Sequence, residues 1–195
     1  MCDEGGMVRE NIARSAVPPE PGRLDVSQVF KKHRRQIERW ASRLGGPLVD
    51  CDDVVQDVFM VVHRRLPELR ADAALTSWLY KITENVATRR RQRERLRRWI
   101  RGMSRDYTED VAAPGPSAID EMERREAALE IYAALDRLDE KYRSVVILFE
   151  IEGFTGEEIA ALTGRPLATV WMHLYRGRQR FRRHYEKQLA KRQTR

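Results

Sequence analysis

Apolar residues recur at helical spacing along most of this chain. The first stripe consists of Val29, Ile37, Trp40, Ala41 and Leu44, and the second consists of Val54, Val55, Val58, Val62 and Leu66. Gly45-Gly46-Pro47 separates the two stripes, Pro67 ends the second, and a third long pattern starts at about Ser77. Such spacing places one apolar face of each helix against a core. Because no sustained alternation of apolar and polar residues occurs, we predict an all-α fold.

A polar interruption divides the chain into two parts. Residues 102–122 contain few core-forming residues, two prolines and a net negative charge, which is typical of an interdomain linker. Helical patterns resume at about Glu123. We therefore predict two small helical domains joined by a flexible linker. The predicted parts are a flexible leader over 1–26, a first domain over 27–98, a linker over 99–123, a second domain over 124–187 and a basic tail over 188–195.

The second domain contains the pattern of a helix-turn-helix. Thr155 and Glu158 have the spacing of a capping box, and Gly164 is suited to the C-terminus of a short helix. Arg165-Pro166 would form the turn, after which Val170 and Leu174 point inward. The positions expected to face outward are Thr169, Trp171, Met172, Tyr175, Arg176 and Arg178. The pattern favours a recognition helix for the DNA major groove, and the alternative is a purely structural helical hairpin.

The charge distribution indicates contacts with a polyanion. The 195 residues contain 37 Lys plus Arg against 30 Asp plus Glu, and the excess is concentrated in two blocks. Residues 27–99 hold 17 bases and 9 acids, and residues 165–195 hold ten bases and one acid. Two basic blocks suggest two nucleic-acid contacts on one chain, although solvated helix faces would produce similar runs.

Several functional classes do not fit the composition. The longest apolar runs, Val58–Val62 and Val145–Phe149, are too short to span a membrane. Two cysteines, Cys2 and Cys51, are too few for a disulfide framework, which fits a reducing cytosol. We expect no cofactor, no metal site, no small-molecule substrate and no membrane insertion. The four histidines lack metal-ligand spacing and are interpreted as surface or boundary residues.

Two polar helix faces in the first domain are candidate binding surfaces. Asp53, Gln56, Asp57 and Met60 share one face away from the valines, which taken alone would be ordinary solvent surface. Trp78, Ile82, Asn85 and Arg89 share a face of the next helix, with Lys81 and Thr88 beside it. An aromatic ring, an amide and cations together can stack on a base, bond its edge and hold its phosphates. A buried Trp and a solvated Asn would give the same pattern.

Three segments carry the most specific sequence patterns: DDVVQDVFMVVHRRL (52–66), LTSWLYKITENVATRRRQR (75–93) and TVWMHLYRGRQRF (169–181). In this order they resemble the extracytoplasmic-function group of RNA polymerase sigma factors. The first is similar to the D-x-x-Q-[ED]-x-F pattern of the family's polymerase-binding helix. The second is similar to its SWLY-x-I-x-x-N signature. The similarity covers roughly 27–98 and 124–184.

The resemblance implies a role for each segment. Asp53, Gln56, Asp57, Phe59 and Met60 would bind the clamp coiled coil of core RNA polymerase. The residues implied for the minus-ten element are Arg70, Asp72, Ala74, Trp78, Lys81, Asn85 and Arg89. The residues implied for the minus-thirty-five element are Arg165, Thr169, Trp171, Met172, Tyr175, Arg176 and Arg178. Other implied partners are the polymerase flap and an anti-sigma protein, and the implied location is the cytoplasm, with nucleoid association on polymerase.

Departures from the family pattern and rival functions limit this interpretation. Trp171, Met172 and His173 stand where relatives commonly have small and basic residues, so base preference at the minus-thirty-five element does not follow. The nearest rival is a stand-alone helix-turn-helix regulator that needs no polymerase to bind its site. An enzyme is the second rival, but the chain has no Gly-rich phosphate loop and no metal-ligand spacing.

Overall fold

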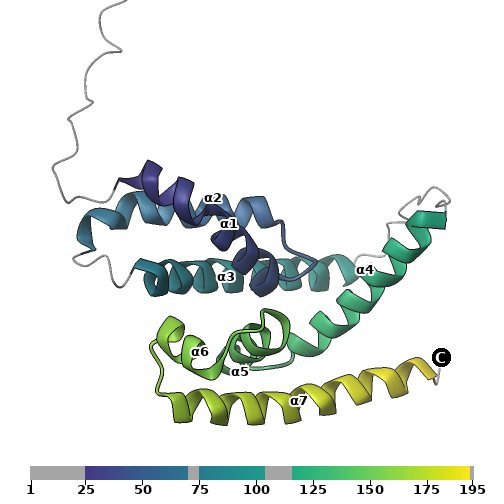
Figure 1. The fold of residues 1–195 in the computed structure, drawn as a ribbon. Coiled ribbons are helices and arrows are strands. Elements are labelled where there is room, and N and C mark those ends of the chain that lie inside the picture. The colour runs from purple at the N-terminus through teal and green to yellow at the C-terminus, as the bar shows by residue number, and fades with distance from the viewer. Residues whose placement is uncertain (1–24, 70–74, 104–115, 194–195) are drawn as a thin grey trace, which may run out of the picture.

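The computed structural model describes residues 25–69, 75–103 and 116–193, and every regular element in these ranges is helical. The N-terminal part consists of α1 (Val26–Gly45), α2 (Cys51–Arg65), η1 (Leu66–Glu68) and α3 (Leu75–Met103). The C-terminal part consists of α4 (Pro116–Leu135), α5 (Glu140–Val146), η3 (Ile147–Ile151), α6 (Gly156–Thr163) and α7 (Leu167–Gln193). In Figure 1, α3 lies between the α1–α2 pair and the C-terminal helices. The predicted all-α class is confirmed.

The N-terminal core is built from the two predicted stripes. Val29, Ile37, Trp40, Ala41 and Leu44 of α1 are buried, as are Val54, Val55, Val58 and Val62 of α2. Asp50 caps α2 by accepting hydrogen bonds from the backbone N–H groups of Asp52 (2.9 Å) and Asp53 (3.2 Å). These bonds satisfy two of the donors that a helix start leaves unpaired. Pro67 follows in the turn η1, where the helix ends as predicted.

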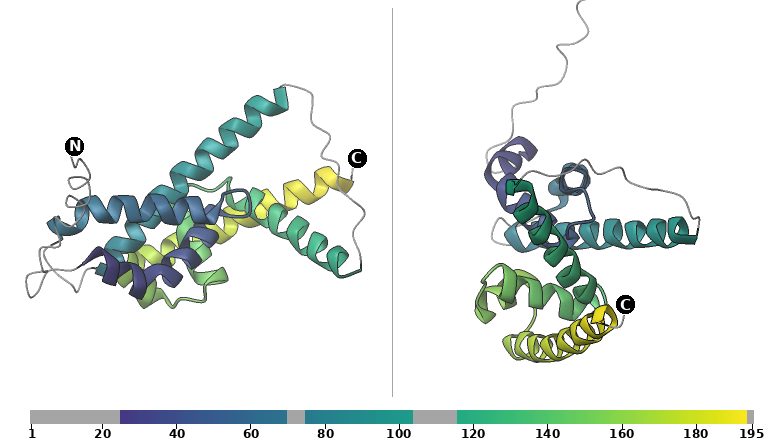
Figure 2. Two further views of the ribbon diagram at one scale, coloured as in Figure 1. Left: turned by 90° about the horizontal axis from the view of Figure 1, so that it is seen from above. Right: turned by 90° about the vertical axis from the view of Figure 1, so that its right-hand side faces the viewer.

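The long helices extend beyond the predicted domain limits. Helix α3 continues to Met103 and α4 begins at Pro116, so both ends of the predicted linker are helical. Glu94 stabilises the extension because it pairs with Arg98 and Arg101 at 3.4 and 3.2 Å. Figure 2 shows this end of α3 projecting away from the other helices. Likewise α7 runs to Gln193, through most of the predicted basic tail. The predicted leader, except for its last two residues, lies outside the described ranges.

The helix-turn-helix has the predicted local geometry. Thr155 and Glu158 form a reciprocal capping box, with side-chain-to-backbone distances of 3.2 and 2.8 Å. Gly164 adopts the left-handed conformation (φ 68°) that ends α6 and favours glycine. Val170 and Leu174 of α7 are buried against the C-terminal core. The turn therefore fixes α7 relative to α6 before any ligand is present.

Two histidines are more buried than the surface or boundary positions expected of them. His33 and His173 are buried, at 8% and 9% exposure. The ring of His173 packs edge-on against Tyr142, with centroids 5.3 Å apart, and burial lowers the pKa of His173. Both lie on helix faces whose neighbouring apolar residues point inward, so they fill core positions. None of the helices in the described ranges is long and apolar enough to cross a membrane.

Gly177 allows α7 to approach α5 closely. A Cβ atom on this residue would lie 2.6 Å from Cγ2 of the buried Val146. Alanine favours a helix over glycine by about 1 kcal/mol, but overpacking a core generally costs about 1–3 kcal/mol. We therefore expect Gly177→Ala to lower the free energy of unfolding by up to about 2 kcal/mol, measured in urea. Gln179→Ala, at an exposed position one half-turn away, should leave the urea midpoint unchanged. An unchanged midpoint for Gly177→Ala would contradict the close approach.

Candidate polymerase and nucleic-acid interfaces

The outer face of α2 presents the predicted acid–amide cluster. Asp53, Gln56 and Met60 are exposed and Asp57 is half-buried, so four of the five predicted residues share one surface. The fifth, Phe59, turns away from this surface. Its ring packs against Phe30 of α1, with centroids 4.6 Å apart. Phe59 therefore supports this surface by packing between α2 and α1, and it is not part of the polar face.

An arginine of α3, missed in the sequence, organises this face. Arg90 donates from Nε to Asp57 Oδ2 at 2.7 Å and from Nη1 to Asp53 Oδ2 at 2.6 Å. Asp53 and Asp57 lie four residues apart on one helix, where like charges repel. Arg90 offsets this repulsion and fixes both carboxylates, and the hydrogen bond with Asp57 raises the pKa of Arg90. In the sequence, Arg90 is one of three consecutive arginines, and nothing in the pattern distinguishes it from its neighbours.

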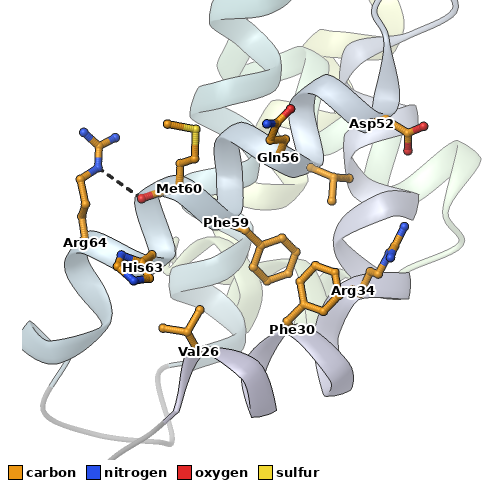
Figure 3. Close-up of a pocket in the computed structure, with 10 residues that line it drawn as sticks. Val26, Phe30, Arg34, Asp52, Gln56, Phe59, Met60, His63 and Arg64 are labelled. Atoms are coloured by element: carbon orange, nitrogen blue, oxygen red, sulfur yellow. Dashed lines mark hydrogen bonds between the residues drawn. The ribbon is translucent and has the colours of Figure 1, made fainter. Parts of the chain in front are cut away.

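An apolar groove of about 760 Å³ runs beside the acid–amide face, between α1 and α2. Figure 3 shows the Phe30 and Phe59 rings side by side, with Met60 and Gln56 at one edge. The residues that line it are Val26, Phe30, Arg34, Asp52, Val55, Gln56, Phe59, Met60, His63 and Arg64. Gln56 and Met60 thus belong to both the polar face and the groove. A partner that binds the polar face would also contact apolar surface.

A second groove, on the other side of α2, contains the predicted base-binding residue Asn85. It has a volume of about 400 Å³ and lies between α2 and α3. Asn85 and Arg89 of α3 face Arg64 and Arg65 of α2 across it. Cations on two walls and an exposed amide suit a nucleic-acid strand, because they hold phosphates and bond a base edge. Arg64 and Arg65 were not predicted, although they stand together in the last turn of α2.

Two other predicted minus-ten residues in the described ranges, Trp78 and Lys81, do not line this groove. Trp78 is half-buried against the core, and Ile82, beside it, is buried at 8% exposure. Lys81 lies on a different side of α3, where its Nζ approaches Gly164 of the helix-turn-helix. Arg70, Asp72 and Ala74 lie outside the described residues. The structure therefore groups Asn85 with Arg89 and does not place Lys81 beside them.

The recognition helix α7 exposes most of its predicted residues. Tyr175 is 64% exposed, Trp171 44% and Met172 39%. Trp171 rests edge-on against Phe149 at 5.8 Å and closely over Gly156, where a Cβ would lie 2.5 Å from the indole. This large side chain is therefore accommodated by a glycine in α6, a relation that sequence spacing alone did not indicate.

The remaining predicted minus-thirty-five residues, which are three arginines and a threonine, differ in their surroundings. Arg176 is exposed, and its hydrogen bond lowers the pKa of the Tyr142 phenol. Arg178 pairs with Glu150 at 2.5 Å and lies over the Phe149 ring. Thr169 and Arg165 are half-buried, and the charge of Arg165 acts on Glu84 of α3. Thus Thr169, Met172 and Arg176 form one helical stripe, whereas Arg165 lies toward the N-terminal domain.

Comparisons with known proteins match both halves of the chain. The family model for sigma-70 region 2 matches residues 29–97, and that for sigma-70 region 4 matches residues 128–181. The ECF RNA polymerase sigma factor SigE of Mycolicibacterium smegmatis is 35% identical over 158 residues, which cover 80% of this chain and 59% of SigE. The ECF sigma factor SigM of Mycobacterium tuberculosis is 31% identical over 175 residues, which cover 90% of this chain and 84% of SigM.

A solved structure shares the fold. The structure of CnrH in complex with the cytosolic domain of CnrY superposes with a TM-score of 0.53 at 23% identity. The superposition covers 83% of this chain and 88% of CnrH. The chain spans only 59% of the length of SigE, so the correspondence with that relative is partial.

Proposed function

Because the chain belongs to the family of ECF RNA polymerase sigma factors, we propose that it binds core RNA polymerase and directs it to specific promoters. It would also promote melting of the DNA at the start of transcription, as an alternative factor that responds to stress or another signal. Its role is that of an initiation factor rather than an enzyme. It acts in the cytoplasm, where it associates with the nucleoid when bound to polymerase.

The arrangement around α2 is the observation that carries this proposal. One side of the helix bears the Asp53–Asp57 face, and its last turn contributes Arg64 and Arg65 to the basic groove. A protein bound to the first surface would therefore hold DNA next to the second. A stand-alone DNA-binding regulator has no need for such a protein-binding face beside a site suited to single strands.

The helix-turn-helix supplies the duplex contact in this proposal. Exposed Met172, Tyr175 and Arg176 would contact the minus-thirty-five element in the major groove, which admits a helix. Asn85 and Arg89 would bind the unpaired minus-ten strand. Lys81 and Arg165 complete the two proposed sets of DNA contacts, and both lie near the boundary between the domains.

Two further protein contacts belong to the proposal. An apolar groove of about 490 Å³ between α4, η3 and α7 includes Ile131, Leu135, Phe181 and Tyr185. It suits an apolar helix, and we assign it to the polymerase flap. An anti-sigma protein is the proposed inhibitor, since CnrH, which shares this fold, was solved with the cytosolic domain of a second protein.

Run-off transcription with purified core polymerase tests the function. The template is the region upstream of the gene that encodes this chain. We expect a discrete transcript only when both polymerase and chain are present, together with a polymerase-dependent gel shift of the same DNA. A shift of equal strength without polymerase would instead support the stand-alone regulator, and no transcript from genomic promoter fragments would overturn the proposal.

A further inference from the structure

The first turns of α7 carry no charge in the part of the helix that would lie nearest to DNA bases. Residues 167–175 contain no Lys, Arg, Asp or Glu, and also no Asn or Gln. Residues 176–183, which follow directly, contain five arginines. In a helix-turn-helix, the N-terminal residues of the second helix contact base edges. The positive charge of α7 therefore begins only after the segment that would read a base sequence.

Four side chains of this uncharged segment face away from the core. Val170 and Leu174 are buried, and with 3.6 residues per turn Met172 lies on the opposite side of the helix from both. Three neighbours share that side at helical spacing. We define the apolar patch as Ala168, Trp171, Met172 and Tyr175, all of which are exposed. The sequence analysis placed three of them outward but did not include Ala168.

Packing on both flanks fixes the apolar patch. The Trp171 indole lies closely over Gly156 of α6 and edge-on to Phe149 of η3. On the inner side of the helix, the buried His173 ring packs against Tyr142. Burial lowers the pKa of His173, so this ring stays uncharged near neutral pH. The patch is therefore presented in a defined shape, with no cation among or beneath its residues.

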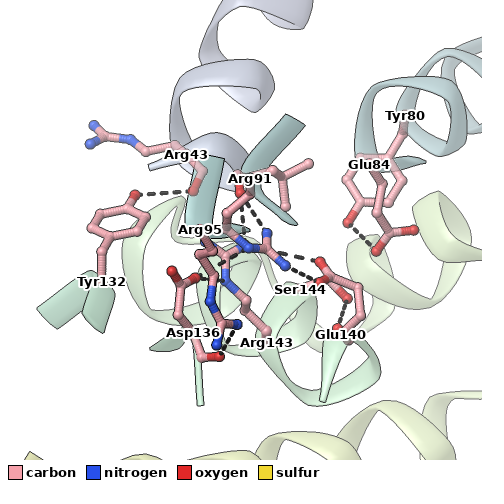
Figure 4. Close-up of polar contacts among 11 residues, drawn as sticks. Arg43, Tyr80, Glu84, Arg91, Arg95, Tyr132, Asp136, Glu140, Arg143 and Ser144 are labelled. Carbon is pink, nitrogen blue, oxygen red and sulfur yellow. Dashed lines mark hydrogen bonds and ion pairs between the residues drawn. The ribbon is translucent and has the colours of Figure 1, made fainter. Parts of the chain in front are cut away.

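The apolar patch belongs to an outer helix of the molecule. In Figure 1, α5 and α6 lie between α7 and α3. The N-terminal domain contacts other parts of the C-terminal domain, as Figure 4 shows for Arg91 of α3, which pairs with Glu140 and, at 3.2 Å, with Asp136. Met172 and Tyr175 remain 39% and 64% exposed among the described residues. The patch is therefore accessible to a partner.

The side chains that select three of the four bases are missing from residues 167–175. In the major groove, Arg or Lys pairs with guanine, Asn or Gln pairs with adenine, and Asp or Glu accepts a hydrogen bond from cytosine. None of these six residue types occurs in the segment. Thymine alone presents a methyl group in this groove, and apolar side chains such as alanine contact it. An apolar surface placed against base edges therefore favours thymine.

We propose that the apolar patch reads thymine methyl groups in the major groove of the minus-thirty-five element, with Ala168 and Met172 as the contacting residues. The inference rests on the proposed function and adds its base preference. It gives a role to Trp171 and Met172, which depart from the family pattern. Ala168 and Met172 lie about 6 Å apart along the helix, close to two base-pair steps of about 3.4 Å. The thymines should therefore lie within two or three neighbouring base pairs.

The charge around the apolar patch favours DNA over a protein as its partner. Residues 165–195 hold ten bases and one acid. The arginines from Arg176 onward can hold phosphates, which position a helix on the duplex without reading its sequence. The apolar patch and these arginines thus divide the two tasks of a recognition helix along α7.

Replacing thymine by uracil in the bound DNA would test the proposal, because uracil pairs in the same way and lacks only the methyl group. The full-length chain with core polymerase first selects duplexes from a library randomised over the minus-thirty-five region. Each selected thymine is then replaced in turn by uracil, and a gel shift gives the dissociation constant. We expect about fourfold weaker binding at one to three neighbouring positions, which corresponds to the loss of one buried methyl group. The other positions should show no change.

Variants of α7 assign this methyl effect to the apolar patch. Met172→Ala should abolish the difference between the thymine and uracil duplexes at one or more of these positions. Leu189→Ala is the matched control, since it truncates another exposed apolar side chain of α7, about 25 Å farther along the helix, and should keep the difference. Arg176→Ala should weaken binding to both duplexes alike. The ratio of the two affinities is measured on one protein sample, so partial unfolding of a variant does not change it.

Met172→Gln provides a second variant of nearly the same side-chain length. Its amide can pair with adenine, so selection with this variant should shift the preferred base from thymine toward adenine at the affected position. Equal binding of all thymine and uracil duplexes by the unchanged chain would overturn the proposal, as expected if the patch binds a protein instead. A full methyl effect at every position in both Met172 variants would also overturn it.

Omitting core polymerase separates this inference from the proposed function. If the chain selects the same duplexes equally well without polymerase, the proposed function fails, and the comparison of thymine with uracil on those duplexes still decides the base preference. If binding requires polymerase but uracil has no effect at any position, the proposed function stands and the reading of methyl groups is overturned. If no duplex is selected under either condition, both are overturned.

Discussion

Replacing Gln56 and Asp57 together by alanine is expected to weaken binding to core polymerase at least tenfold. Asp57 lies at the centre of the α2 face and Gln56 is exposed beside it. Loss of a charged hydrogen bond at an interface generally costs about 2–5 kcal/mol, and about 1.4 kcal/mol corresponds to a factor of ten. Fluorescence titration of labelled polymerase would measure the affinity.

Helix α2 itself should tolerate this change. Both side chains lie off the buried valine stripe, and Arg90 retains Asp53 as a partner at 2.6 Å. Gln28→Ala with Glu38→Ala makes the same kind of change on α1, outside the acid–amide face, and should leave the affinity unaltered. Equal affinity of the Gln56–Asp57 variant and the unchanged chain would remove this face from the polymerase contact.

Local patterns predicted the helices well because their determinants lie within a few residues of each other. The stripe from Val29 to Leu44 is buried as expected, and the Thr155–Glu158 cap and the left-handed Gly164 are present. Helix α3, however, continues past the predicted end of the first domain, to Met103. An exposed helix such as the end of α3 needs only ion pairs along its own surface, and apolar periodicity does not reveal these.

Contacts between distant segments could not be predicted in this way. Arg143 and Leu44 are 99 residues apart, and no spacing rule joins a side chain to a backbone carbonyl at that separation. The same limit applies to Arg90, which pairs with Asp57 across 33 residues. Lys81 shows a related limit of grouping residues by their spacing. Sequence proximity grouped it with Asn85, whereas its side chain lies beside Gly164, because neighbours on a helix can face different partners.

Asn85→Ala is expected to slow open-complex formation at least tenfold while changing initial promoter binding less than twofold. The exposed amide lies in the basic groove with Arg64, Arg65 and Arg89, where it can bond the edge of an unstacked base. Extruding a base costs a few kcal/mol, which contacts in the groove must offset. In the proposed function, initial binding would depend instead on contacts between the helix-turn-helix and duplex DNA. Permanganate reactivity of unpaired thymines would report opening directly.

A premelted template distinguishes a base contact from a structural role. If Asn85 binds an unpaired base, mismatches across the minus-ten region should restore part of the loss, because the unpairing cost is gone while the contact is still missing. Gln92→Ala, at another exposed position of α3 outside the groove, should behave like the unchanged chain on both templates. Normal thymine reactivity with Asn85→Ala on fully paired DNA would mean that this amide is only solvated surface. The basic groove would then have to hold the strand through its arginines alone, without reading a base.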